Sequence, residues 1–385
     1  MEVEFLGPFA IFTGVLAQFV PVWIGMAVIM GASFVFRRRL AFYGRIFDSP
    51  IGMIGFGLVL FWVLTAILAD QVAVFDPYVQ LRALQNEPPG AIDPENGLPF
   101  LFGGDMLGRD VFSRMVYGSR SVMIIAPLAT LFAYMIGITL GLPAGYFGGW
   151  LDTALSFLAN LVLAFPVILL FYLLVTPEIR ATPIPGAMAA VLFIFPVIFL
   201  LVFFWSRYSV RPDVLWYYIT PILLIGGFIY LGLIGAWDPT GRIAMDANTL
   251  NIFLAVVFVS SPTVFRIVRG LTLDIKTRDY VAAAQTRGER PWYIMMWEIL
   301  PNARGPLIVD ACLRIGYTTI LLGTLGFFGL GVSPESPDWG STINEGRKLL
   351  RIYVHPALPP AIALMSLVLG LNLLADAMRE QSMKD

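Results

Sequence analysis

The residues whose types and spacing suit a specific task lie in a polar stretch in the second half of the chain, residues 279–302. Its first part carries the alanine run 282–284, which favours helix and leaves one helix face without bulk. Gly288 is placed where glycine ends a helix, and Pro291 suits the first position of a second helix. The chemistry that this pattern favours is non-covalent, because a smooth helix face among basic residues suits docking to another protein at a membrane surface. Those basic residues are Lys276, Arg278, Arg287 and Arg290.

Two further features predict where these helices begin and end. Thr277 or Asp279 is expected to cap the first helix, because a short polar side chain accepts the free amide hydrogens of an opening turn. Pro301 is expected to close the second helix, because proline disfavours helical backbone in the residue before it. The simplest alternative is an ordinary interfacial helix pair. The second helix is apolar and aromatic through Trp292, Ile294, Met295, Trp297 and Ile299.

The sequence contains none of the motifs that would predict catalysis or a bound cofactor. It has no Gly-x-x-x-x-Gly-Lys-Ser/Thr phosphate loop, no His-Glu-x-x-His zinc motif and no Gly-x-Ser-x-Gly nucleophile elbow. Its one histidine, His355, cannot build a metal site alone, and its one cysteine, Cys312, excludes an intramolecular disulfide. We therefore expect a protein that is not an enzyme, binds no ATP itself and needs no cofactor.

The composition predicts a membrane protein. Of the 385 residues, 58% are hydrophobic and 13% are charged, and several apolar runs reach the ~20 residues that a helix needs to cross a bilayer. Helices satisfy their own backbone polar groups in lipid, so an all-α, polytopic integral membrane fold is expected. The formal net charge of −1, without a basic aromatic patch, gives no sign of nucleic acid as a partner. Glu2 and Glu4, before a long apolar run, predict a retained span rather than a cleavable signal.

About nine transmembrane helices are predicted, and the basic residues beside them predict their orientation. The approximate ranges are residues 9–36, 51–69, 121–146, 151–175, 184–205, 215–237, 249–268, 307–332 and 359–378. Basic residues beside a span favour the cytoplasm, and they follow the first, fifth and seventh spans. They are Arg37, Arg38, Arg39, Arg207, Arg211, Arg266 and Arg269. This pattern predicts an external N-terminus, a cytoplasmic C-terminus and a cytoplasmic position for residues 279–302.

The stretch 279–302 resembles the EAA coupling loop in the permease subunits of ATP-binding-cassette (ABC) importers, specifically those of the dipeptide/oligopeptide/nickel family. The matching positions are Tyr280, Ala283, Ala284, Gly288, Ile299, Leu300, Pro301 and Asn302. Ala282 stands where the family has a glutamate, which keeps the small-residue face and removes the carboxylate. The resemblance implies that Ala282 and the matching residues form the contact with a cytoplasmic ATPase.

A second stretch, residues 104–120, resembles the long family signature that reads GTDxxGRDxxSRxxxGxR. The residues assigned to it are Gly104, Asp105, Gly108, Arg109, Asp110, Ser113, Arg114 and Gly118, and Trp339 and Gly340 belong to a further family match. Leu107, Val111, Met115 and Gly118 also recur at helical spacing, with the charged residues elsewhere around the helix. A plain amphipathic lead-in to a span is therefore the alternative interpretation of this stretch.

The resemblance also implies how the chain is organised, as a six-helix, type I importer core with additions. The expected parts are residues 1–47, an extra N-terminal transmembrane helix and basic link; 48–175, the first part of the core with an external loop at 70–105; 176–247, an inserted helix pair; and 248–385, the second part of the core with a cytoplasmic coupling loop at 270–304.

The function that the resemblance implies is ATP-driven import of short peptides or similar solutes across a bacterial or archaeal inner membrane. The implied partners are a second, homologous permease, two ATPase subunits that hydrolyse ATP, an extracytoplasmic solute-binding protein and membrane lipid. The alternative is a stand-alone secondary transporter or channel. That class predicts charged or unwound residues at mid-membrane, whereas the centres of the predicted spans are nearly free of charge.

Overall fold

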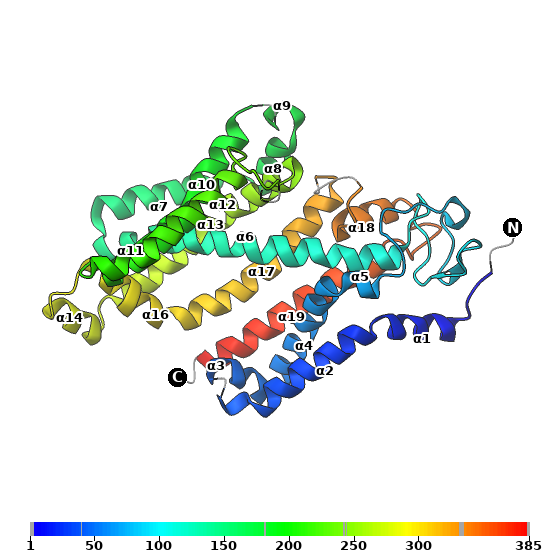
Figure 1. Ribbon diagram of the computed structural model, residues 1–385, viewed down its shortest axis with the longest axis horizontal. Coiled ribbons are helices and arrows are strands. Elements are labelled where there is room, and N and C mark those ends of the chain that lie inside the picture. Colours follow the sequence, from blue (N-terminus) through cyan, green and yellow to red (C-terminus); the bar gives the residue numbers. More distant parts are fainter. Residues whose placement is uncertain are drawn as a thin grey trace. The chain divides into compact units, whose positions relative to one another are not determined.

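The computed structural model describes residues 4–39, 41–180, 182–241, 243, 245–330 and 335–382. This part of the chain is almost entirely helical (Figure 1), so the predicted all-α class is confirmed. The chain divides into two compact units, a first unit of Met1–Pro127 with Val309–Asp385 and a second unit of Leu128–Ile308. The border between them falls within two long helices, α6 (Val111–Phe147) and α17 (Arg304–Phe327).

Each unit contains further helices, and the first also holds a short strand pair. The other elements of the first unit are α1 (Pro8–Gln18), α2 (Val20–Val35), η1 (Arg37–Arg39), α3 (Ala41–Gly44), η2 (Arg45–Asp48), α4 (Pro50–Ile67), α5 (Ala69–Val72), η3 (Arg82–Leu84), β1 (Ala91–Ile92), β2 (Pro99–Phe100), α18 (Trp339–Arg347) and α19 (Leu358–Ser382). Those of the second unit are α7 (Gly149–Ala164), α8 (Val167–Val175), α9 (Pro177–Arg180), α10 (Ile184–Tyr208), α11 (Pro212–Pro221), η4 (Ile222–Gly226), α12 (Gly227–Leu233), α13 (Ala247–Ile275), α14 (Asp279–Thr286), α15 (Pro291–Tyr293), η5 (Ile294–Ile299) and α16 (Leu300–Asn302).

The number of helices that could cross a membrane agrees with the predicted number of spans. Within the described residues, seven helices are long and apolar enough, and two bent pairs raise the number to nine if each pair is one span. The bent pairs are α1 with α2, which meet at 51°, and α7 with α8, which meet at 80°. Pro166 lies at the second bend, where the proline nitrogen has no hydrogen to donate to a helical hydrogen bond, which accounts for the break. The seven are α4, α6, α10, the run α11–η4–α12, α13, α17 and α19.

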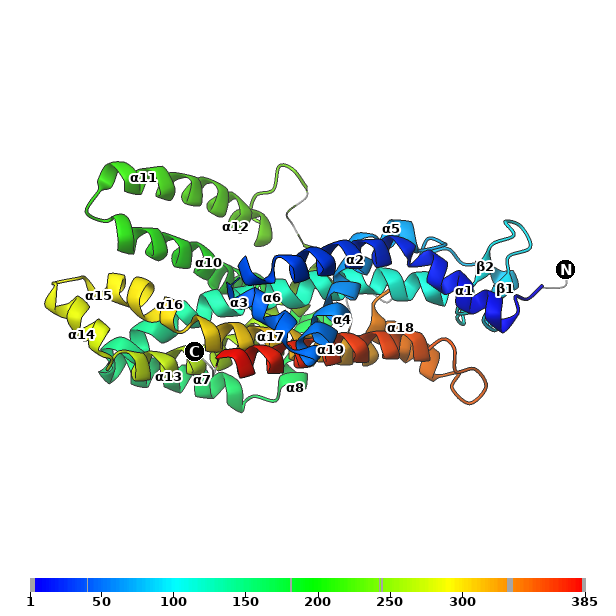
Figure 2. The same cartoon turned by 90° about the horizontal axis from the view of Figure 1, so that it is seen from below.

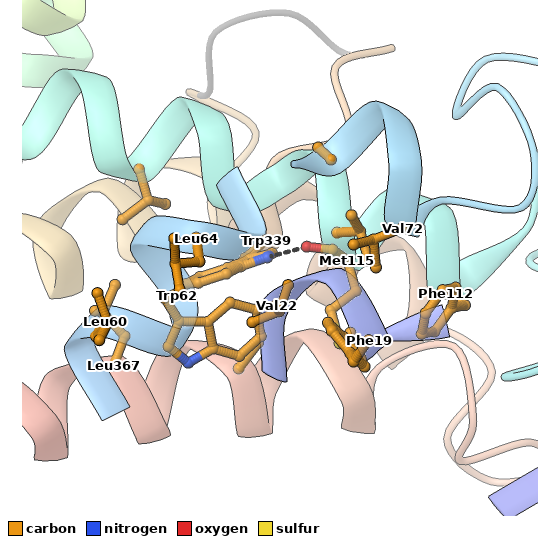
Figure 3. Packing of buried hydrophobic residues seen from close by; sticks show 14 of the residues in the cluster. Phe19, Val22, Leu60, Trp62, Leu64, Val72, Phe112, Met115, Trp339 and Leu367 are labelled. Atoms are coloured by element: carbon orange, nitrogen blue, oxygen red, sulfur yellow. Dashed lines mark hydrogen bonds between the residues drawn. The ribbon is translucent and has the colours of Figure 1, made fainter. Parts of the chain in front are cut away.

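The first unit is built around a hydrophobic cluster that joins its N-terminal, middle and C-terminal helices. Figure 3 shows the indole Nε1 of Trp339 donating a hydrogen bond to the carbonyl oxygen of Met115 at 2.8 Å. Trp62 of α4 meets Trp339 edge-on, with ring centroids 4.9 Å apart. Phe19 and Val22, from the α1–α2 pair, are buried in the same cluster. The α1–α2 pair is therefore an integral part of this unit, in which α4 also packs along α19 (Figure 2).

Close packing in the second unit depends on three glycines of α6 that are spaced four residues apart. A Cβ atom on Gly137 would lie 2.5 Å from the Val264 side chain, and one on Gly145 would lie 2.7 Å from that of Thr272. Gly141 approaches the same helix, α13, equally closely. Small residues let helix backbones approach in lipid, where van der Waals contact drives helix association. The three glycines therefore serve the packing of α6 against α13.

The external loop contains more structure than its sequence predicts. No secondary structure is expected from residues 70–105, yet the loop carries η3 and the antiparallel pair β1–β2, in which Ala91 lies opposite Phe100. Leu84, Ala91 and Phe100 are buried together in a small apolar cluster. The prediction fails because strands of two residues are too short to show a hydrophobic period.

Candidate functional site

Residues 279–302 form the predicted pair of short helices, which lies at one end of the second unit (Figure 2). The first is α14, and the second runs continuously through α15, the π-helical η5 and α16. Gly288, between them, has a φ of +77°, a conformation that glycine adopts at little cost. Pro291 occupies the first turn of the second helix. Both turn-forming roles predicted from the sequence are therefore confirmed.

The predicted cap of the first helix is wrong. Arg278 occupies the cap position, and its side chain makes no capping hydrogen bond. The Thr277 hydroxyl instead donates to the carbonyl oxygen of Asp274 at 2.8 Å, because it lies close to the end of the preceding helix. Asp279 lies inside the first turn of α14, where its negative charge is favoured by the amide groups of the helix N-terminus.

The predicted end of the second helix at Pro301 is also wrong. Helical backbone continues through Pro301 to Asn302, and α17 begins at Arg304. The wide turns of η5 precede Pro301 and place it in the first turn of α16, where its missing N–H is tolerated. The side-chain amide of Asn302 also donates to the carbonyl oxygen of Glu298 at 2.6 Å, which satisfies one backbone acceptor there.

The alanine run does not form a single exposed face. Ala284 is fully buried, as is Val281 three residues earlier on the same side of α14, and this side packs against η5. Ala282 and Ala283 are exposed, and so is Gly288. The expectation that Ala284 lies on an exposed small-residue face is therefore wrong. We call the exposed set the alanine surface, which consists of Ala282, Ala283 and Gly288.

The other residues of the predicted coupling set differ in their exposure to solvent. Tyr280 is 39% exposed, whereas Ile299 is fully buried and supports the pair from inside. Burial raises the pKa of the Tyr280 hydroxyl, so it stays a neutral hydrogen-bonding group near neutral pH. Leu300 is half-buried and Pro301 is exposed. The helix pair thus brings all eight predicted residues into one element, but only some of them reach its surface.

Polar contacts fix the orientation of this helix pair. Lys276 donates to a backbone carbonyl at the end of α6 at 2.8 Å, and the Gln285 side chain donates to the Tyr146 hydroxyl at 3.2 Å. Arg287 joins the two helices through an ion pair of 3.1 Å with Glu298. An exposed ion pair contributes only ~0–1 kcal/mol, so this contact mainly sets the angle between the helices.

Four charged residues of the second predicted site, the signature stretch 104–120, are buried rather than solvent-facing, whereas Arg120 is partly exposed. Asp105, Arg109, Asp110 and Arg114 are each at most 2% exposed, whereas Leu107 is 42% exposed. Val111 and Met115, two apolar positions of the pattern, are buried as well, so these charges do not form an exposed face opposite an apolar one. The first unit encloses both sets of residues.

Partners from a distant part of the sequence allow these charges to be buried. Arg109 Nε donates to Asp105 at 2.6 Å, and the same guanidinium pairs with Glu345 of α18. Arg114 donates to the carbonyl oxygen of Ser336 at 3.0 Å. A buried charge is costly unless it is paired and hydrogen-bonded. The signature therefore ties the start of α6 to the segment that contains α18.

Asp110 and Ser113 attach the external loop to the start of α6. The Asp110 carboxylate accepts hydrogen bonds from the Ser113 backbone at 2.9 Å and the Ser113 hydroxyl at 2.6 Å. The Ser113 oxygen in turn accepts from the backbone N–H groups of Val74 and Phe75 at 3.2 and 3.0 Å. Burial is the main reason why the pKa of Asp110 rises to about 6.

The signature glycines and Trp339 complete this enclosed cluster. A Cβ atom on Gly118 would lie 2.5 Å from the Trp339 ring, and one on Gly340 would lie 2.3 Å from the carbonyl oxygen of Gly323. Gly104 and Gly108 approach neighbouring carbonyl oxygens as closely. All ten signature residues therefore lie together in the first unit, where their contacts are structural.

Sequence reasoning missed two acidic residues of this cluster. Glu345 lies in a stretch that matches the family, but nothing near it in sequence indicates its partner, Arg109. Asp338 caps α18 by accepting from the Gly340 backbone at 2.8 Å, and burial raises the pKa of its carboxyl. Its position just before a short helix is the signal that predicts such a cap. Residues 331–334, within the same family match, lie outside the described residues.

The site offers surfaces and hydrogen bonds rather than reactive groups. Within the described ranges, no cluster of three or more His, Cys, Asp or Glu side chains could hold a metal ion. The Nε2–H group of His355 donates a hydrogen bond to the carbonyl oxygen of Gly104 at 3.0 Å, a contact that belongs to the enclosed cluster.

Comparisons with known proteins agree on one class. Residues 203–382 match the family model described as "binding-protein-dependent transport system inner membrane component". The chain is 28% identical over 329 residues to a dipeptide transport system permease protein of Haemophilus influenzae, covering 85% of this chain and 88% of the relative. It is 30% identical over 278 residues to a glutathione transport system permease protein of Pectobacterium atrosepticum, covering 72% of this chain and 70% of the relative. A dipeptide transport system permease protein of Alkalihalophilus pseudofirmus is 26% identical over 309 residues, which is 80% of each chain.

Proposed function

This chain belongs to the dipeptide and oligopeptide family of ABC importer permeases, which are multi-pass inner-membrane proteins, and from that premise we propose that it couples a path for short peptides to cytoplasmic ATPase subunits through residues 279–302. ATP binding and hydrolysis belong to the partner subunits in this proposal. The chain itself supplies helices that line the path and a surface on which an ATPase docks.

The observation that carries this proposal is the alanine surface on a firmly held helix pair. Ala282 and Ala283 present no bulk to an incoming partner, while Val281 and Ala284 bury their side chains inside the pair. Such a pair can transmit a displacement without deforming, because its interior is packed. Gly288 sets the angle between its two helices.

The substrate class follows from the relatives. Their names specify a dipeptide and glutathione, which is a tripeptide, so we propose short peptides as the solutes of this chain. The partners that follow are a second permease of the same family, two ATPase subunits and an extracytoplasmic binding protein that delivers the peptide. The binding protein supplies most of the selectivity in this arrangement.

The orientation that we propose has residues 279–302 and the C-terminus in the cytoplasm, and the N-terminus outside. Basic residues at the predicted cytoplasmic ends motivate it. One contact within the second unit supports it, since the Arg207 guanidinium carbon lies 4.4 Å from the centre of the Trp297 ring. The turn after α10 and the helix pair therefore belong on the same side of the membrane, as the distribution of basic residues requires.

Reconstitution into liposomes tests this function. A labelled mixture of di- and tripeptides should enter vesicles only when this chain is combined with its partner permease, the ATPases, the binding protein and ATP. Vesicles that hold this chain alone should neither hydrolyse ATP nor accumulate peptide. Peptide flux through the chain alone would instead support a stand-alone transporter or channel.

A further inference from the structure

The inserted helix α10 makes a compact contact with the second helix of the coupling pair. The indole Nε1 of Trp297 donates to the Ser206 hydroxyl oxygen at 3.0 Å. The Phe203 ring lies with its centroid 4.6 Å from that of Trp297, and the Arg207 guanidinium carbon lies 4.4 Å from the Trp297 ring centre. One side chain of the coupling pair is thus held by three side chains of the insertion.

These three residues form one face of α10, because positions 203, 206 and 207 are separated by three and four residues. Ser206 is 5% exposed, and its hydroxyl donates to the Phe203 carbonyl at 2.8 Å while it accepts from the indole. Each hydrogen bond therefore has a clear donor and acceptor. A further contact, from Arg290 to the Ser209 hydroxyl at 3.2 Å, joins the start of the second coupling helix to the end of α10.

The opposite part of α10 is anchored in the helical core of the second unit. The Phe193 ring packs 5.5 Å from Phe132 of α6 and 5.7 Å from Phe253 of α13, measured between centroids. Phe132 and Phe253 also contact each other at 5.3 Å. The helix therefore connects the core of the unit with the coupling pair, and Figure 2 shows its far end beside α15.

We propose that the end of α10 is a brace that positions the coupling helix pair, with Phe203, Ser206 and Arg207 acting through Trp297. This inference rests on the proposed coupling function of residues 279–302. A cation held over an aromatic ring and a buried hydroxyl that accepts from the indole restrain η5 against α10. Residues of the brace are positioning residues, since they do not form the alanine surface themselves.

The brace should influence how efficiently ATP hydrolysis is converted into transport, rather than whether an ATPase binds. The alanine surface stays intact when Trp297 is shortened, so docking is preserved. A loosened second helix, however, absorbs part of the displacement that the ATPase imposes. The expected signature is a lower number of peptides imported for each ATP hydrolysed.

Hydrogen exchange of the full chain in lipid nanodiscs tests the contact itself. Trp297→Ala should speed amide exchange across residues 291–302 by roughly threefold to tenfold, the effect of losing a cation–π and packing contact. Trp297→Phe keeps an aromatic ring but not the N–H donor, so its exchange rate should lie between those of Trp297→Ala and the unmodified chain. Arg211→Ala is the matched control, because it removes an exposed arginine from the same turn and should leave exchange unchanged. Exchange that is the same in Trp297→Ala and the unmodified chain would overturn the brace.

The ratio of imported peptide to hydrolysed ATP, measured in the assembled transporter, tests the role of the brace in coupling. With ATPases co-purifying at an unchanged level, Trp297→Ala and Arg207→Ala should each lower the ratio of imported labelled peptide to hydrolysed ATP by roughly threefold or more, and Arg207→Lys should restore it in part. A simple loss of folded protein would lower import and hydrolysis together and leave the ratio unchanged, a result that contradicts the positioning role. If an Ala283→Arg variant kept full ATPase binding, the coupling function itself would fail, and the exchange result would still decide whether the brace exists.

Discussion

Lys276 donates a hydrogen bond from its ammonium group to the carbonyl oxygen of Gly145 at 2.8 Å, which ties the entry to α14 to the end of α6. Gly145 is also one of the glycines through which α6 packs tightly against α13. The coupling helix pair is therefore attached to a closely packed part of the second unit. A displacement of the pair would be passed to these helices rather than lost in a flexible linker.

Gly288→Val should impair transport without preventing membrane insertion. The backbone of Gly288 has a φ of +77°, and this conformation costs a non-glycine residue ~1–2 kcal/mol, and more for a β-branched one. No neighbouring atom lies within 4 Å of a Cβ atom built there, so the effect comes from the backbone and not from a clash. Peptide uptake at matched expression measures it. Gly288→Asn is the control, since asparagine tolerates this region, and equal losses in both variants would refute the backbone explanation.

Asp110→Asn should change how the stability of the chain depends on pH. Burial raises the pKa of Asp110 from 3.8 to about 6, so the folded chain favours the protonated carboxyl. The stabilisation from this group is present below pH ~4 and is lost as the pH rises through about 6. Relative to Asp110→Asn, the unmodified chain should therefore lose on the order of 2–3 kcal/mol of stability over this interval. Thermal unfolding of the purified chain between pH 4 and 7.5 measures the difference, and parallel curves for the two proteins would contradict the prediction.

The membrane orientation can be tested with single cysteines on a Cys312→Ser background. Arg38→Cys, Arg211→Cys and Gln285→Cys replace exposed residues on the proposed cytoplasmic side, so they should resist an impermeant thiol reagent in intact cells. Glu95→Cys and Arg351→Cys replace exposed residues of the proposed external loops and should react. All five should react after the membrane is permeabilised. Labelling at position 211 from outside would refute the orientation of the inserted helix pair.

Gly118→Leu should disrupt the enclosed signature cluster. Even a Cβ atom at this position would lie 2.5 Å from the Trp339 ring, and Trp339 is fully buried. Overpacking of this kind typically costs ~1–3 kcal/mol, so a lower melting temperature and a lower yield of folded chain are expected. Gly31→Leu, at an exposed position of α2 where no atom lies within 4 Å of a Cβ atom, is the comparison that should have a smaller effect. Unchanged melting of Gly118→Leu would show that the cluster is not tightly packed.

The sequence predicted that residues 279–302 form two short helices, but it did not predict which of their residues are exposed. Gly288 and Pro291 act through their own backbone preferences, which are visible in the sequence. The burial of Ala284 depends on which side of α14 packs against η5. Helical backbone continues through Pro301 because π-helical turns precede it, and no sequence pattern predicts such turns. Trp297 was recognised as part of an apolar helix, but its partner Arg207 belongs to α10, which lies far away in the sequence.

The signature stretch illustrates the same limit. The helical spacing of apolar residues placed the charges elsewhere around the helix and did not indicate their burial. Arg109 and Arg114 are buried because Glu345 and Ser336 supply their partners. More than 220 residues separate each arginine from its partner along the chain. The fold class and number of spans follow from composition alone, but pairings of this kind depend on the tertiary structure.

The central claim, that an ATPase docks on the alanine surface, is tested most directly by co-purification of the ATPase with Ala283→Arg. Ala283 is exposed, so the substitution adds bulk to the surface without disturbing the interior, whereas the buried Ala284 does not allow a clean test. Ala282→Glu, which restores the residue of the family pattern, is the matched control and should retain the ATPase. Ala283→Arg should reduce the co-purified ATPase by roughly tenfold or more at unchanged membrane insertion. A full complement of ATPase, together with normal uptake, would contradict the account.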